Sequence, residues 1–168
     1  MTGVERVYIG ARPQARDGSG EDDMPQQRTW KVGDSVQLTK TFGDAEIEKF
    51  AELTGDRNPL HVDEAFAART RFKRRIAQGI LSASLISTCI GMHLPGTGAI
   101  YLDQTLRFVK PVYVGDTVTL TATVSHIRHT REEKPLLTLS TIWTNQHGQK
   151  VIEGEAHVML MAPEEISG

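Results

Sequence analysis

One short stretch of the chain places a carboxylate, an amide and an imidazole within six residues, on Asp56, Asn58 and His61. An aspartate and a histidine close together are the residue types that general acid–base chemistry on a water molecule requires. Pro59 removes one backbone donor and keeps Asn58 out of helical geometry, so we expect an ordered loop between two helices. A plain polar turn, in which Asp56 and Asn58 bond their own backbone, is the structural alternative and stays open at this point.

The stretches on both sides of this loop predict helices that hold it. Apolar residues at helical spacing between Asp44 and Gly55 predict an amphipathic helix, with Asp44 as its N-cap and Gly55 as its stop. After the loop, the run 76–92 has no charged side chain and its apolar residues cover most of a helix circumference. A helix of this kind is buried, and this one is too short to span a membrane.

The rest of the chain predicts strands. Apolar and polar residues alternate with period two in 100–108, 118–124 and 152–160, and 137–144 is rich in strand formers. Period two with one apolar face indicates an antiparallel sheet covered on one side, and hence an α+β fold. We interpret 1–28 as a mobile N-terminal arm and 29–168 as a single domain. The segment 7–9 could pair with a sheet edge or with a partner, and the sequence does not decide between them.

Composition excludes several classes of function. The 168 residues carry a formal net charge of −2, so no general affinity for nucleic acid or an anionic membrane is expected. The single cysteine, Cys89, excludes an internal disulfide and a cysteine-based zinc cluster, and the histidines lack partners at metal-ligand spacing. We expect no metal, no transmembrane helix and no secretory signal. A cytoplasmic location follows as the expectation, with a mitochondrial one as the alternative.

Three features together resemble one protein family: the Asp56-x-Asn58-Pro59-x-His61 element, the apolar run 76–92 and the segment 106–116. They are similar to the MaoC-like (R)-specific enoyl-CoA hydratases and the related 3-hydroxyacyl-thioester dehydratases, over residues 32–161. The resemblance implies a hot-dog fold, in which an antiparallel sheet wraps round a long central helix. It also favours a homodimer, because pairing two sheets removes an exposed edge.

The resemblance implies a hydro-lyase that needs no cofactor. Water would add to the trans-2-enoyl thioester of coenzyme A or of an acyl carrier protein, giving the (R)-3-hydroxyacyl thioester, and the reverse reaction would remove it. Asp56 and His61 would hold this water and carry its proton. The backbone N–H of Gly79, at a helix N-terminus, would stabilise the oxyanion that forms on the thioester. Ser87 matches a serine that steadies the Asp–His pair in these enzymes, and its alternative role is bonding its own helix backbone.

Substrate-binding roles are expected for Asn58, Gln78 and Ser84. Many of the hydratases have a histidine immediately before the glycine that matches Gly79, whereas this chain has Gln78. Glutamine does not titrate near neutral pH, so the role of this side chain is limited to hydrogen bonding. The basic cluster 69–75 is either a solvated face or a contact for the phosphates of a coenzyme A or carrier-protein arm.

Two other functions remain as alternatives. Many hot-dog thioesterases carry a catalytic carboxylate on the central helix, and the run 76–94 contains no carboxylate, which counts against a thioesterase. A non-catalytic acyl-thioester binding subunit is the second alternative. The presence of both Asp56 and His61 counts against it.

Overall fold

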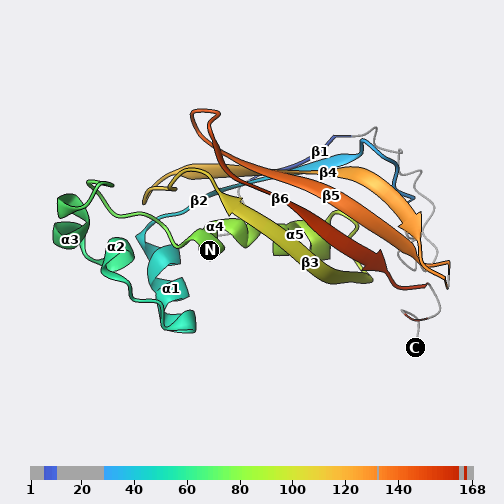
Figure 1. The fold of residues 1–168 in the computed structure, drawn as a ribbon, viewed down its shortest axis with the longest axis horizontal. Coiled ribbons are helices and arrows are strands. Elements are labelled where there is room, and N and C mark those ends of the chain that lie inside the picture. Colours follow the sequence, from blue (N-terminus) through green and yellow to red (C-terminus); the bar gives the residue numbers. More distant parts are fainter. Residues whose placement is uncertain (1–5, 11–28, 132, 163–164, 166–168) are drawn as a thin grey trace, which may run out of the picture.

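The computed structural model describes residues 6–10, 29–131, 133–162 and 165, and a single antiparallel sheet forms its larger layer (Figure 1). The strand order is β1-β2-β4-β5-β6-β3. The strands are β1 (Arg6–Gly10), β2 (Ser35–Thr41), β3 (Ala99–Phe108), β4 (Thr117–His129), β5 (Pro135–Asn145) and β6 (Lys150–Leu160). The strands predicted from alternation are confirmed, and the central ones are longer than predicted.

Alternation determines which face of the sheet is buried. Along β4, Val118, Leu120 and Ala122 have no exposed surface, whereas the threonines between them are half-buried. Successive strand side chains point to opposite faces, so the apolar set lies on one side of the sheet. That side forms the core, where β5 contributes Trp143 as a fully buried side chain.

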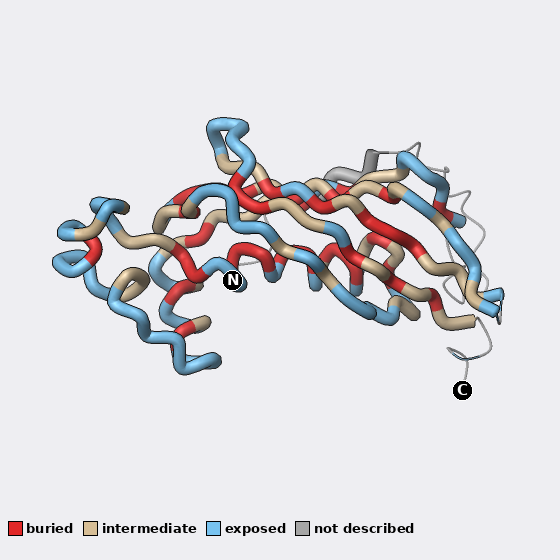
Figure 2. Tube along the Cα trace, in the orientation of Figure 1, coloured by how far each residue is buried: buried red, intermediate tan, exposed pale blue. Residues whose placement is uncertain are grey.

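Two helices, α4 (Gly79–Ala83) and α5 (Leu85–Met92), lie on this apolar side (Figures 1 and 2). The α+β expectation is therefore confirmed, and the expected long central helix is divided into two parts at Ser84. The helix is interrupted at Ser84, whose N–H is shared between the carbonyls of Ile80 and Leu81 and whose hydroxyl donates to Leu81 O at 2.6 Å. A serine hydroxyl that bonds the preceding turn competes with the regular backbone pattern and bends helices.

Three short helices project beyond one end of the sheet: α1 (Asp44–Thr54), α2 (Pro59–Val62) and α3 (Glu64–Arg69) (Figure 1). Gly43, and not Asp44, is the N-cap of α1, and its N–H donates to the Glu46 carboxylate at 3.1 Å. Asp44 is the first residue inside the helix and pairs instead with Arg75. This ion pair ties the start of α1 to the segment that leads into α4.

The first strand, β1, lies within the expected N-terminal arm 1–28. β1 pairs antiparallel with β2, with Arg6 opposite Thr39 and Gly10 opposite Ser35. The segment 7–9 thus pairs with a sheet edge, which is one of its two expected partners. The other residues of the arm, 1–5 and 11–28, lie outside the described residues.

The opposite edge strand, β3, departs from the expected pattern of one buried face. Ile100 is 37% exposed, and Leu102 and Phe108 are each 50% exposed. The pairing of β3 with β6 shifts register between Tyr101 and Asp103, so Leu102 falls at an irregularity. Because no further strand covers β3 within the described residues, its side chains keep much of their surface.

Candidate active site

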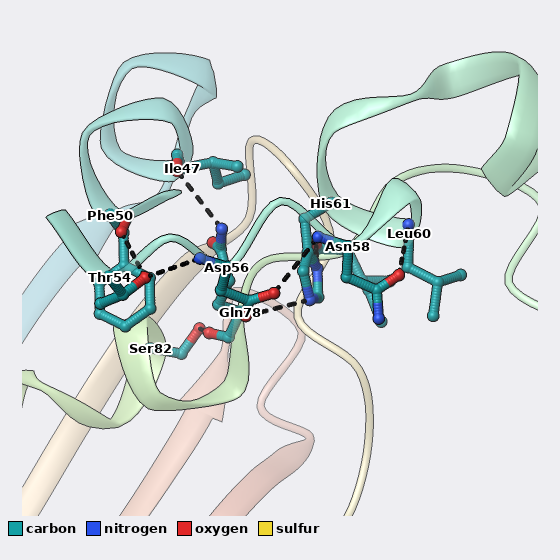
Figure 3. A network of polar contacts seen from close by, with 10 residues as sticks. Ile47, Phe50, Thr54, Asp56, Asn58, Leu60, His61, Gln78 and Ser82 are labelled. Carbon is teal, nitrogen blue, oxygen red and sulfur yellow. Dashed lines mark hydrogen bonds and ion pairs between the residues drawn. The ribbon is translucent and has the colours of Figure 1, made fainter. Parts of the chain in front are cut away.

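The loop predicted between two helices is present and connects α1 to α2 (Figure 3). Gly55 ends α1 with a φ of 79°, a left-handed conformation that glycine adopts at little cost. Asn58 caps α2, because its side-chain oxygen accepts a hydrogen bond from Leu60 N at 3.1 Å, and Pro59 occupies the first helical position. These two helix signals fix both ends of the segment that carries Asp56 and His61.

Asp56 and His61 face each other across this loop (Figure 3). The distance from Asp56 Oδ2 to His61 Nε2 is 3.9 Å, which is longer than a direct hydrogen bond. The Asp56 side chain is 45% exposed and that of His61 12%. Asp56 Oδ1 also accepts a hydrogen bond from Asn58 N at 3.3 Å, which holds the carboxylate toward the loop.

The hydrogen bonds of His61 determine which of its nitrogens is free. Its Nδ1 lies 2.8 Å from the backbone oxygen of Ile76. A carbonyl oxygen only accepts hydrogen bonds, so Nδ1 carries the proton and donates it. In the neutral imidazole, Nε2 is therefore the basic nitrogen, and it is the one that faces Asp56.

A cavity of about 280 Å³ lies beside this pair. Its wall is mostly apolar and is built from α4, the segment before α4, and the segment that follows β3. The polar side chains in the wall are His61, Arg71, Ser82 and Lys110. A mostly apolar cavity with a few convergent polar groups is the usual form of a small-molecule site.

Gly79 also lines the cavity and is the first residue of α4. The first N–H groups of a helix have no acceptor within the helix, so the Gly79 N–H is available to a ligand. A Cβ placed on Gly79 would lie 2.8 Å from the ring of Phe108, another wall residue. A larger residue at this position would therefore force the Phe108 ring to shift.

Gln78, immediately before Gly79, is 2% exposed and does not belong to the cavity wall. Its Nε2 donates to Ile47 O on α1 at 3.4 Å, and its Oε1 has no partner among the described residues (Figure 3). The side chain therefore ties the start of α4 to α1. A substrate contact for Gln78 stays a prediction.

The remaining predicted residues lie outside the cavity wall. Asn58 uses its carbonyl oxygen as a helix cap, and Ser84 bonds the backbone of its own helix. Ser87 is exposed on α5 and makes no side-chain hydrogen bond within the described part of the chain. The structure thus places His61 and Gly79 in one cavity wall, and Asp56 adjoins that wall only through His61. The roles of all the predicted site residues stay predictions.

Most wall residues were not among the predicted site residues, and those that matter for the chemistry are Arg71, Ser82, Phe108 and Lys110. Two sequence signals pointed near them, namely the basic cluster 69–75 and the segment 106–116. Neither signal shows which residues of these two segments line the cavity, because the lining depends on the contact between β3 and the start of α4.

Comparison with known proteins agrees with this geometry. Residues 24–145 match the family described as the MaoC like domain. The chain belongs to the MaoC-like family. This MaoC-like protein is 49% identical over 130 residues to an (R)-specific enoyl-CoA hydratase of Aeromonas caviae, covering 77% of this chain and 95% of that protein. It is 38% identical over 130 residues to a mitochondrial 3-hydroxyacyl-[acyl-carrier-protein] dehydratase of Solanum lycopersicum, covering 77% of each chain.

Solved structures give the same assignment for the fold. An (R)-hydratase from A. caviae involved in PHA biosynthesis superposes with a TM-score of 0.75 at 48% identity, covering 80% of this chain and 99% of that chain. The expected hot-dog fold is confirmed. As a MaoC-like hydratase or dehydratase, the protein is an enzyme of the hydro-lyase class.

The part of the chain that the structure describes bears on the expectations of no metal and no transmembrane helix. There, no three His, Cys, Asp or Glu side chains gather as a metal site would require. No helix in that part is long and apolar enough to cross a membrane. The expectations of no metal, no cofactor and a cytoplasmic location stay predictions.

Proposed function

We propose that this MaoC-like protein adds water reversibly to a trans-2-enoyl thioester and forms an (R)-3-hydroxyacyl thioester. The observation that carries the proposal is the facing pair of Asp56 Oδ2 and His61 Nε2, 3.9 Å apart beside an apolar cavity. The separation suits two acceptors that share one water molecule. The (R) configuration is supported by the name of the Aeromonas caviae relative.

Proton balance assigns the roles of the pair. As the water oxygen bonds to C3, the water loses one proton, and C2 gains one proton. His61 Nε2 is suited to take the proton, because Nδ1 is already committed to Ile76 O. Asp56 orients the water and stabilises the imidazolium that forms, and the proton then passes to C2. Dehydration follows the same steps in reverse.

The negative charge that develops on the thioester oxygen needs a donor. The Gly79 N–H is at the start of α4 and in the wall of the same cavity as His61. A preorganised backbone donor at this position stabilises an oxyanion without reorganisation, and the loss of one such donor costs roughly 3–4 kcal/mol in acyl-transfer enzymes. A mostly apolar wall lowers the effective dielectric near this donor, which strengthens the interaction.

Substitution of the pair tests the proposal. We expect Asp56→Ala and His61→Ala each to lower hydration of crotonyl-CoA by about 10²-fold or more, because a positioned acid–base group contributes about 10²–10⁴-fold. Loss of enoyl-thioester absorbance measures the rate, and chiral analysis of the product checks its configuration. Circular dichroism should show an intact fold. Near-native turnover in either variant would contradict the mechanism.

The same assay separates the alternatives. A hot-dog thioesterase would release free thiol, and a non-catalytic binding subunit would change neither signal. Within α4 and α5 no residue is a carboxylate, so the structure offers no acid on the central helices for a thioesterase.

We also propose a homodimer formed by pairing two copies of β3. β3 is a ten-residue edge strand with exposed apolar side chains, and an edge of this kind is a ready template for another strand. The helices add to this face, because Ile80 is 56% and Met92 71% exposed. Light scattering should give twice the chain mass. Substituting Leu102 with lysine should shift the protein toward the monomer, and an unchanged mass would contradict pairing through β3.

A further inference from the structure

The cavity wall carries an unbalanced positive charge. Arg71 and Lys110 belong to the wall, and no aspartate or glutamate does. Within the described residues, neither cation has a carboxylate partner, whereas Arg75 pairs with both Asp44 and Glu64. An enoyl chain is neutral and gives no reason for two unpaired cations beside its cavity. The charge therefore points to an anionic part of the substrate.

The position of Arg71 is built into the turn that follows α3. Thr70 Oγ donates to Ala67 O at 2.8 Å and accepts from Phe72 N at 3.2 Å. Lys73 completes the turn with a φ of 65°, which is uncommon for a residue other than glycine. The Arg71 guanidinium then lies 4.8 Å from the centre of the Phe72 ring, and both residues line the cavity. Stacking on an aromatic ring orients a guanidinium and leaves its edge donors free.

Lys110 belongs to the same cavity wall, and hydrogen bonds hold the backbone that carries it. The N–H groups of Val109 and Lys110 both donate to Val151 O, at 2.8 and 3.2 Å. Pro111 follows and fixes the chain direction. Two segments that are distant in sequence thus bring the planar guanidinium of Arg71 and the ammonium of Lys110 to one cavity. This combination suits a phosphate group.

We propose that Arg71 and Lys110 bind a phosphate of the arm that carries the thioester. This proposal rests on the proposed function, because it assigns the carrier end of the same substrate. Coenzyme A and the prosthetic group of an acyl carrier protein share the phosphate at the end of the pantetheine unit. The site recognises this shared group, and the acyl chain occupies the apolar wall.

The test compares thioesters with and without phosphate. Arg71→Gln and Lys110→Gln are assayed with crotonyl-CoA and with the phosphate-free thioester of N-acetylcysteamine. We expect kcat/KM for crotonyl-CoA to fall about ten- to a hundredfold, mainly through KM, since a hydrogen bond to a charged group contributes about 1.5–3 kcal/mol. Turnover of the N-acetylcysteamine thioester should not change. Arg69→Gln is the matched control, because Arg69 is exposed and lies outside the wall.

Two results would overturn the proposal. Equal losses with both thioesters would show that the cations support the fold or the chemistry, and no loss with either would show that they are solvated surface groups. Crotonyl-4′-phosphopantetheine distinguishes the carriers. If the two substitutions lower kcat/KM for this substrate as much as for crotonyl-CoA, the site binds the shared phosphate. If they do not lower it, the site binds the adenosine phosphates, and the shared phosphate is not the ligand.

A binding measurement separates this proposal from the proposed reaction. Calorimetric titration of the unaltered protein with free coenzyme A should show binding that weakens with salt and is lost in Arg71→Gln/Lys110→Gln. Binding without turnover would contradict the proposed reaction and support the phosphate site. Turnover by the unaltered protein, together with an unchanged affinity of the double variant for coenzyme A, would support the proposed reaction and contradict the phosphate site.

Discussion

At the scale of single residues, Gly79 combines a packing constraint with a proposed role in catalysis. Its missing Cβ leaves room for the Phe108 ring, and the residue lines the cavity at the start of α4. We expect Gly79→Ala to lower the melting temperature, because overpacking costs typically 1–3 kcal/mol. In a Phe108→Ala background, the same substitution should have little effect on stability. A double-mutant cycle by thermal unfolding measures this coupling. An additive loss would show that the added methyl group meets something other than Phe108.

Cys89 gives a prediction about pH. Burial raises the pKa of the Cys89 thiol to about 12, well above the value of about 8.5 for a free cysteine. Between these values the folded chain keeps a proton that the unfolded chain releases, so the free energy of unfolding falls as pH rises through this window. At lower pH the contribution is complete. A thiol reagent at about pH 8.5 should therefore react with Cys89 only after denaturation. Rapid labelling of the folded protein would contradict its burial.

At the scale of secondary-structure elements, the cap of α2 positions the proposed catalytic histidine. Asn58 holds Leu60 N, and His61 follows within the same four-residue helix. Asn58→Ala should destabilise this turn by about 1 kcal/mol and lower activity by displacing His61. Asn58→Asp keeps a capping oxygen and should retain activity. If both variants lose activity equally while the fold stays intact, the Asn58 amide has a direct role with substrate.

The elements also show why some site residues could be predicted from the sequence. Asp56 and His61 share one loop whose ends are set by Gly55 and Pro59, so local signals suffice to bring them together. Phe108 and Lys110 reach the site only because the segment before α4 pairs with the segment after β3. Ala77 N donates to Val112 O at 2.8 Å, and Ile76 bridges Tyr113. This non-local pairing leaves no periodic signal in either segment.

The same distinction holds for the helices and strands. The period-two stretches predicted β4 and β6, and the strand formers in 137–144 predicted β5, because each of these strands has one mostly buried face. The central helix was predicted from its lack of charge, but the interruption at Ser84 was not. A serine hydroxyl either points to solvent or bonds the preceding turn, and the sequence is the same in both cases.

At the scale of the whole molecule, the two sheet edges differ in length. β1 has five residues and covers the seven-residue β2, whereas β3 presents ten residues. A variant that starts at Gln27 removes β1 but no proposed catalytic residue, so hydratase activity per chain should be retained. Its exposed β2 edge should produce species larger than a dimer at high concentration, as seen by light scattering. A variant that starts at Arg6 is the control. A single dimeric species in the shorter variant would contradict a protective role for β1.

The short outer strand also limits how far association can proceed. A subunit with two open sheet edges can bind one neighbour at each edge, as a bifunctional monomer does, and repeated pairing of this kind yields a fibre. Short edge strands adhere poorly, so a subunit that ends in β1 on one side has a single reactive edge. In the proposed dimer, two such subunits pair through their β3 edges, and neither keeps a reactive edge for a third subunit. In the language of polymerisation, β1 leaves each subunit monofunctional, and a monofunctional unit ends the growth of a fibre.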